Sequence, residues 1–154
     1  MEHFDSERAK RVWQRVQSGT PPQQAPLQSL QGLIQRELTD GVTYQQLMRR
    51  LQGKEQLVLR QLYEQKMRNA AILKGICLLT EGTAPQVAPY PVTGDPAAVL
   101  LRRCYGSQQQ TLAEYESRKE DPQNGRIFQK LAEQTLSDCC VLLELLGKEH
   151  QKRR

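Results

Sequence analysis

The sequence predicts an all-α protein that folds as a bundle of four long helices. Three observations lead to this fold class. The segment Glu64–Leu73 returns in similar form as Glu133–Leu142, 69 residues later, as expected for a helical hairpin that occurs twice. Apolar residues recur at the period of an amphipathic helix over most of the chain. Helix start and stop signals divide the chain into two hairpins, which one long irregular connection joins.

Length and composition agree with one domain of this class. A chain of 154 residues is long enough to bury a sizeable core. Hydrophobic residues make up 38% of the chain and aromatic residues 5%, so the core must be mainly aliphatic. The chain is rich in Leu and Gln and poor in runs of β-branched residues, which favours helices.

Residues 1–26 form an N-terminal segment ahead of the predicted bundle. Ser6 is a predicted N-cap for a short helix over residues 6–17, and Trp13 lies on its apolar face as a packing residue. Three prolines in residues 20–26 predict an extended linker.

The predicted bundle occupies residues 27–147 and begins with a first hairpin. Apolar spacing predicts one helix over residues 28–51 and a second over residues 54–80. Gly53 separates the two helices, and Gly82 is a plausible C-terminal stop for the second.

A long connection and a second hairpin follow. Residues 82–94 contain three prolines and predict an irregular crossover. Asp95-Pro96 predicts the start of a third helix that runs to residue 119, with Asp at the N-cap and Pro at the first helical position. Asp121-Pro122 repeats this signal for a fourth helix, which we expect to end near Gly147.

The net charge of +5 comes partly from a basic tail at residues 148–154. Cations suit the C-terminal end of a helix, and the absence of aromatic residues from the tail argues against a nucleic-acid-binding surface. No signal segment and no run of about 20 apolar residues is present, which predicts a cytoplasmic protein without a membrane partner.

Cysteine and histidine usage limits the chemistry. Cys77, Cys104, Cys139 and Cys140 all lie in apolar helical contexts, so we expect small core residues with free thiols. The two histidines, His3 and His150, lie near the chain ends. This placement excludes a Ser-His or Cys-His nucleophile pair and a His-containing metal site from the body of the fold.

The two halves of the chain share more than the ten-residue echo. Glu37 is followed by Tyr44 seven residues later, and Gln108 is followed by Tyr115 at the same spacing. The echo adds two positions to each half, which are Lys66 and Asn69 in the first and Thr135 and Asp138 in the second.

With these residues the chain resembles rubrerythrin-like members of the ferritin-like superfamily, which are of bacterial type. The resemblance covers residues 27–147. It is carried by Leu33-Ile34-x-x-Glu37-Leu38, the Glu-to-Tyr spacing, Asn69-Ala70-Ala71-x-Leu73-Lys74-Gly75-Ile76, Cys104-Tyr105, Glu114-Tyr115, Asp121-Pro122-x-x-Gly125 and Leu142-Leu143-Glu144-Leu145-Leu146-Gly147. It implies a ferritin-like four-helix bundle with one long crossover.

The resemblance also implies where a di-iron site would lie. Such bundles use one Glu from each of two helices and a Glu-x-x-His from each of the other two. The corresponding positions here are Glu37, Lys66, Asn69, Gln108, Thr135 and Asp138. Only Glu37 keeps the ligand type, and the six side chains sum to a net charge of −1 where an intact site supplies four carboxylates.

The sequence therefore predicts a degenerate metal site with no catalytic, cofactor-binding or metal-binding residues. We expect Glu37 to be a paired core carboxylate and Lys66 to be its ion-pair partner. Tyr44 and Tyr115 are expected to be packing residues with hydrogen-bonded hydroxyl groups.

Three functions remain open on this interpretation. The first is a non-catalytic helical scaffold or interaction module without a cofactor, for which the partner is an unidentified protein, with a homodimer as one option. The alternative is a rubrerythrin-like oxidoreductase or peroxidase that uses iron in a weakened site with Glu37 and Asp138. A small basic nucleic-acid-binding protein is the third and least favoured interpretation.

Overall fold

The computed structural model describes residues 29–152, and these residues form four α-helices without a strand. The helices are α2 (Leu30–Met48), α3 (Lys54–Glu81), α4 (Ala97–Ser117) and α5 (Gly125–Lys152). The predicted all-α four-helix bundle is thus confirmed. The predicted short helix over residues 6–17 and its linker lie outside the described residues.

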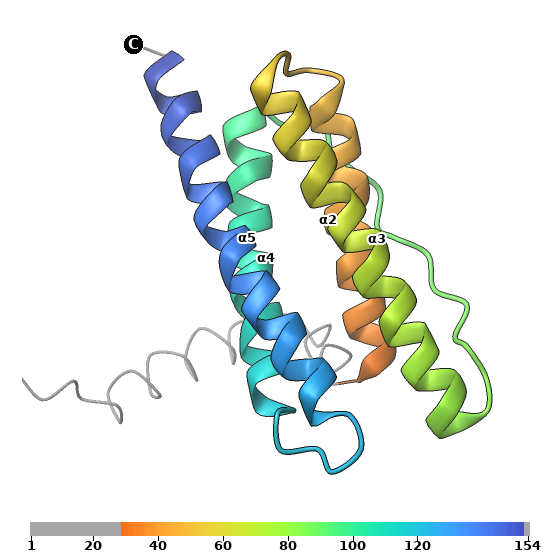
Figure 1. The fold of residues 1–154 in the computed structure, drawn as a ribbon. Coiled ribbons are helices and arrows are strands. Elements are labelled where there is room, and N and C mark those ends of the chain that lie inside the picture. The colour runs from red at the N-terminus through yellow and green to blue at the C-terminus, as the bar shows by residue number, and fades with distance from the viewer. Residues whose placement is uncertain (1–28, 153–154) are drawn as a thin grey trace, which may run out of the picture.

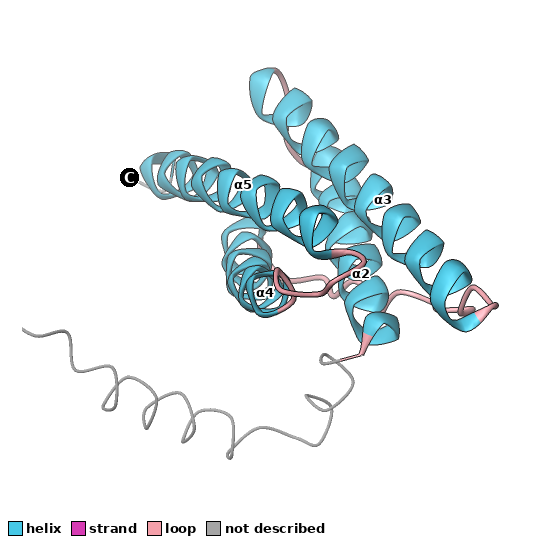
Figure 2. Ribbon diagram, turned by 60° about the horizontal axis from the view of Figure 1, so that its bottom comes forward, coloured by secondary structure: helices cyan, strands magenta, loops and turns pink. Residues whose placement is uncertain are grey.

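The helices pack as two hairpins, α2 with α3 and α4 with α5 (Figure 1). The two hairpins contact each other through α2 against α4 and through α3 against α5. Residues 82–96 contain neither helix nor strand, and this connection runs along the bundle from the end of α3 to the start of α4 (Figure 1). The other loops of the described chain are short and lie at the helix ends (Figure 2).

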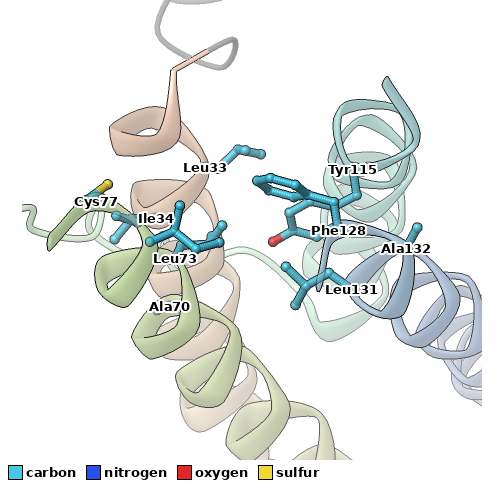
Figure 3. Packing of buried hydrophobic residues seen from close by; sticks show 10 residues of the cluster. Leu33, Ile34, Ala70, Leu73, Cys77, Tyr115, Phe128, Leu131 and Ala132 are labelled. Atoms are coloured by element: carbon cyan, nitrogen blue, oxygen red, sulfur yellow. The ribbon is translucent and has the colours of Figure 1, made fainter. Parts of the chain in front are cut away.

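The core consists of two separate apolar clusters, one at each end of the bundle. The first cluster, of which Figure 3 gives a close view, comprises Leu33, Ile34, Ala70, Leu73, Ile76, Cys77, Tyr115, Phe128, Leu131 and Ala132. The second comprises Tyr44, Leu47, Leu51, Leu59, Leu62, Leu100, Leu101, Cys104, Leu142 and Leu145.

The cluster memberships define the direction of each helix. The first cluster joins the beginnings of α2 and α5 to the ends of α3 and α4, and the second cluster joins the opposite ends. The contacting pairs α2–α4 and α3–α5 are therefore antiparallel, whereas α3 and α4 run in the same direction. Two parallel helices that follow one another need a connection as long as the bundle, which residues 82–96 provide.

The ends of the first hairpin show two common capping interactions. The Ser29 hydroxyl accepts a hydrogen bond from the Gly32 N–H at 3.0 Å and caps the start of α2. Gly82 has a positive φ of 79°, and its N–H donates to the Leu78 carbonyl at 3.1 Å. This left-handed residue ends α3 as predicted, because glycine adopts such a φ without a steric cost.

The predicted starts of the last two helices require correction. Pro96, and not Asp95, is the N-cap of α4, because the Asp95 carboxylate pairs instead with the Arg103 guanidinium at 2.6 Å. The Asp121 carboxylate accepts hydrogen bonds from the N–H groups of Gln123 and Asn124 at 2.8 and 2.9 Å. This turn delays the start of α5 to Gly125.

Two further predictions differ from the structure. The helix α5 continues beyond Gly147 to Lys152, where the Lys152 ammonium pairs with Glu55 at 2.6 Å and with Glu149 at 3.2 Å. Three of the four cysteines are buried, as expected, but Cys140 is exposed, because it follows Cys139 directly and faces away from the core. All four thiols are free.

None of the helices within residues 29–152 is long and apolar enough to cross a membrane.

Candidate functional site: a buried polar layer

A layer of polar side chains separates the two apolar clusters. Each helix contributes two residues at i, i+3 spacing, which places both on one helix face. The polar layer comprises Glu37, Asp40, Lys66, Asn69, Gln108, Thr111, Thr135 and Asp138, and every one of them is buried. It contains all six positions that the sequence implicated.

Lys66 is at the centre of the layer. Its side chain is 0% exposed, and its ammonium lies 3.3 Å from Glu37 Oε2 and 2.8 Å from Gln108 Oε1. The expected ion pair between Lys66 and Glu37 is thus confirmed. Glu37 is also fully buried and accepts a second hydrogen bond from Asn69 Nδ2 at 2.8 Å.

The hydrogen bonds join three helices. Gln108 accepts from Lys66 and uses its Nε2 group to donate to the Tyr44 hydroxyl at 3.1 Å. The network therefore runs from Asn69 through Glu37, Lys66 and Gln108 to Tyr44, and links α2, α3 and α4. The hydroxyl of Tyr44 is hydrogen-bonded, as predicted. Burial raises the pKa of Tyr44 well above its usual value, so this phenol stays neutral.

The two residues from α5 face the layer but do not join this network. The Thr135 hydroxyl donates to the Leu131 carbonyl of its own helix at 2.7 Å. Asp138 accepts from Gln134 at 3.1 Å through Oδ1, whereas Asp138 Oδ2 has no hydrogen-bond partner among the described residues. Burial raises the pKa of Asp138, and the charge of Lys66 opposes this rise.

Two buried hydroxyl groups also lack hydrogen-bond partners within residues 29–152, that of Thr111 in the layer and that of Tyr115 in the first apolar cluster. Burial raises the pKa of Tyr115 well above its usual value, and the nearby Glu37 carboxylate adds to this rise. The Tyr115 hydroxyl nevertheless makes no hydrogen bond of good geometry within the described residues. The prediction of a hydrogen-bonded hydroxyl is therefore wrong for Tyr115. Its ring packs against Phe128, with ring centroids 6.3 Å apart.

The internal repeat of the sequence is visible in the hydrogen bonds. Gln65 Nε2 donates to Asn69 Oδ1 at 2.9 Å, and the equivalent Gln134 donates to Asp138 at 3.1 Å. The repeat also exchanges the two apolar clusters. Leu62 and its counterpart Leu131 are both buried but lie in opposite clusters, as a two-fold axis perpendicular to the bundle requires.

Sequence reasoning missed two members of the layer and both glutamines that orient it. Asp40 follows Glu37 by three residues, and Thr111 follows Gln108 by three, which is the spacing from Lys66 to Asn69. Applying that spacing to all four helices would have found them. Gln65 and Gln134 were already inside the ten-residue echo.

Asp40 lies at the edge of the layer nearest α4. Its carboxylate accepts a hydrogen bond from the Ser107 hydroxyl at 2.8 Å, and Ser107 accepts one from Arg36 at 3.2 Å. Burial raises the pKa of Asp40 to about 7, although the positive charge of Lys66 and the hydrogen bond from Ser107 oppose the rise. Asp40 therefore changes its charge near neutral pH.

The residues present do not fit a di-metal centre. Within residues 29–152 no group of three or more His, Cys, Asp and Glu side chains is placed to hold a metal ion. The Lys66 ammonium already binds Glu37, the residue that keeps a ligand type, so a cation would meet a like charge at that carboxylate. Within the layer, the charge of Glu37 is paired with that of Lys66.

The chain matches no protein-family model, and no significant similarity connects it to a characterised protein or to a solved structure. Fold and site define its class as an all-α four-helix bundle with a buried polar centre.

Proposed function

We propose that this chain is a ferritin-like, rubrerythrin-like bundle that has lost its di-metal centre and acts as a non-catalytic helical scaffold or interaction module. The observation that carries the proposal is the position of Lys66, fully buried between Glu37 and Gln108. A fixed ammonium supplies the positive charge that a metal supplies in such bundles, but it offers no open coordination position for a reaction.

The arrangement of the helices supports the ferritin-like part of the proposal. Ferritin-like bundles have one long crossover between two hairpins. In this chain residues 82–96 form the one long connection between described helices, and the antiparallel pairs α2–α4 and α3–α5 join the hairpins. We infer that the buried layer of i, i+3 pairs corresponds to the region in which such bundles carry their ligands.

The alternative function is a metal-dependent oxidoreductase or peroxidase of the same class. It is favoured by the carboxylate groups of Glu37, Asp40 and Asp138, which face one layer, and by the unpartnered Oδ2 atom of Asp138. The Lys66 ammonium argues against this function, because it already pairs with the Glu37 carboxylate that a metal ion would need.

Metal analysis of the purified full chain distinguishes the two functions. Protein expressed with iron supplementation should contain iron at no more than background level, and it should not speed the oxidation of Fe(II) by hydrogen peroxide above the rate in buffer. The Lys66→Glu variant provides a comparison, because it replaces the blocking ammonium with a carboxylate, and Lys148→Glu is its surface control. About two irons per wild-type chain, or a wild-type oxidation rate above buffer, would overturn the scaffold proposal in favour of the oxidoreductase.

A further inference from the structure

A pocket of about 280 Å³ lies between α2, α4 and the crossover, next to the polar layer. This volume is just below the range of about 300–1,000 Å³ that small-molecule sites occupy. The face of α2 contributes Gly32, Gln35, Arg36, Thr39, Asp40 and Thr43, the crossover contributes residues 90–93, and α4 contributes Leu100, Arg103, Cys104 and Ser107.

The crossover is fastened over this pocket by hydrogen bonds. The Tyr90 N–H donates to the Thr39 hydroxyl at 3.0 Å, and Gln35 Nε2 donates to the Ala88 carbonyl at 3.1 Å. At the other end of the covering segment, Arg103 donates to the Thr93 hydroxyl at 2.9 Å and to Asp95 at 2.6 Å. The pocket is therefore a defined cavity with fixed walls on three sides.

Arg36 gives the pocket its chemical preference. The guanidinium reaches from α2 to the Ser107 hydroxyl on α4, which is its one hydrogen bond to another described residue. A guanidinium has five N–H donors, so most of them remain for a ligand. Burial lowers the pKa of Arg36, because it removes part of the hydration of the cation, and the nearby carboxylates of Asp40 and Glu37 oppose this effect. An anion is the partner that restores this lost stabilisation most effectively.

Arg103 also lines the pocket, but its charge is paired with Asp95 at 2.6 Å, so Arg36 is the cation that remains to bind a ligand. Asp40 is already bound by Ser107 and lies beside the charge of Lys66, which reduces its repulsion of an anion. The remaining walls include the apolar side chains of Val92, Leu100 and Cys104.

We propose that this pocket binds a small organic acid, whose carboxylate pairs with Arg36 and whose short aliphatic body lies against Val92, Leu100 and Cys104. A bidentate pair between a guanidinium and a carboxylate supplies both affinity and orientation. The volume limits the ligand to a small metabolite and excludes a long acyl chain. None of the six positions that the sequence implicated lines this pocket, so the proposal does not depend on the proposed loss of a metal.

Two probes with the same carbon skeleton and opposite charges test the proposal on the wild-type full chain. Butanoate and n-butylammonium are titrated at low salt into ¹⁵N-labelled protein, with 1-butanol as the neutral control. Butanoate should shift the amide resonances of Thr39, Val92 and Ser107 with a roughly millimolar Kd, since so small a ligand makes few contacts. The other two probes should bind at least about tenfold more weakly.

A pair of variants tests the role of Arg36. Arg36→Met keeps the length of the side chain but removes its charge, and it should weaken butanoate binding by about tenfold or more. Arg60→Met is the matched control, because Arg60 is exposed on α3 and does not line the pocket, so it should leave the Kd unchanged.

The comparison of the three probes needs no variant, so the proposal stays testable if Arg36→Met does not fold. Equal binding of all three probes would mean a merely apolar cavity. Preferential binding of n-butylammonium would mean that Asp40 and not Arg36 selects the ligand. Resonance shifts confined to residues outside the pocket, no shifts at all, or an unchanged Kd in Arg36→Met would each overturn the proposal.

Discussion

At the scale of single residues, Lys66 decides the electrostatics of the bundle. An unpaired ammonium in a low-dielectric interior is very costly, and here two oxygen acceptors, on Glu37 and Gln108, offset that cost. Glu37 in turn needs Lys66, because Asn69 is its one other hydrogen-bond donor in the described chain. Each charge is stable in the core only while the other is present.

Removal of Lys66 should therefore destabilise the protein strongly. Breaking a buried ion pair from one side typically costs about 3–5 kcal/mol, because the other charge stays buried without a partner. Lys66→Ala should lower the free energy of unfolding by this amount in urea denaturation, and Lys66→Met, which leaves no cavity of comparable size, should still be clearly destabilised. Lys148 is exposed on α5, so Lys148→Ala should change little. Equal stability of the Lys66 and Lys148 variants would show that Lys66 is solvated.

Asp40 should make the stability depend on pH. Its pKa is about 7 in the fold and 3.8 in a model peptide, so the folded state holds a proton that the unfolded state has already lost. The stabilisation is complete below about pH 4 and is lost as the pH rises to about 7, by at most about 4 kcal/mol at 1.36 kcal/mol per pKa unit. Asp138, whose pKa is also raised, acts in the same direction.

The variant Asp40→Asn isolates this contribution. It should be more stable than wild type at pH 8 and should flatten the fall in stability between pH 4 and pH 8, as measured by urea denaturation. Asp121 is a control of opposite sign, because the backbone N–H groups of Asn124 and Gln123 lower the pKa of Asp121. Asp121→Asn should therefore be destabilised relative to wild type, and this loss should be larger at pH 8 than at pH 4. A pH profile of Asp40→Asn that parallels that of wild type would contradict the assignment.

At the scale of helices, two glycines in α5 have opposite roles. A Cβ atom added to Gly125 would collide with the backbone carbonyl oxygen of Lys119, whereas a Cβ atom on Gly147 would meet nothing within 4 Å. The turn that Asp121 builds brings the chain back so closely that only glycine fits at the start of α5. Gly147 is exposed in the last turns of the same helix and carries no such constraint.

The same substitution at these two glycines should therefore change stability in opposite directions. Gly125→Ala forces the backbone of the turn to move and should cost about 1–3 kcal/mol, the usual range for overpacking. Gly147→Ala should stabilise the protein by about 0.5–1 kcal/mol, because alanine loses less conformational freedom in a helix. Thermal unfolding of the two variants checks both signs, and a destabilised Gly147→Ala would mean that the end of α5 makes contacts that the isolated chain does not explain.

Helix periods and the crossover were predictable from the sequence because they depend on local pattern. The helix starts at Asp95 and Asp121 were less predictable, because each aspartate has a competing partner. Asp95 pairs with Arg103, and Asp121 binds the backbone N–H groups of the turn at residues 121–124. In the last turn of α5, beyond the predicted end, Lys152 pairs with Glu55, which lies 97 residues away in the sequence. No local signal reports such a contact.

At the scale of the whole molecule, the sequence located six of the eight polar-layer positions because the repeat marks them twice. It could not reveal that Thr135 turns back to its own helix or that Tyr115 lacks a partner, since these depend on side-chain rotamers. The pocket was equally inaccessible from sequence. It forms where the crossover meets α2 and α4, three segments whose proximity only the fold creates.

The internal repeat relates the two hairpins in such a way that each apolar cluster corresponds to the other. A two-fold axis perpendicular to the bundle must pass through the layer itself, because that axis maps one apolar end onto the other. The layer positions of the two hairpins are then geometric equivalents, even though their side chains differ. If the bundle once held two metal ions, the backbone still presents the ligand positions, and only the side chains were exchanged.

Restoring the ligand types tests this history on the molecule as a whole. The variant carries Lys66→Glu, Asn69→His, Gln108→Glu, Thr135→Glu and Asp138→His, with Glu37 kept, and so supplies four carboxylates and two imidazoles. Without metal it should be less stable than wild type, because four carboxylates then face one another in the core. Added Fe(II) or Co(II) should raise its melting temperature through linkage, while leaving that of wild type unchanged.

The restored site should bind metal measurably but not tightly. The Gln65 and Gln134 amides now donate to Asn69 and Asp138, and they would have to reorient toward the new imidazole groups. Loss of such supporting hydrogen bonds costs about 10–100-fold in metal affinity. Circular dichroism must first establish that the variant is a helical bundle. If it is, and neither metal shifts its melting, the six positions were never a ligand set, and the repeated i, i+3 pairs are a device for separating two apolar clusters with a polar layer.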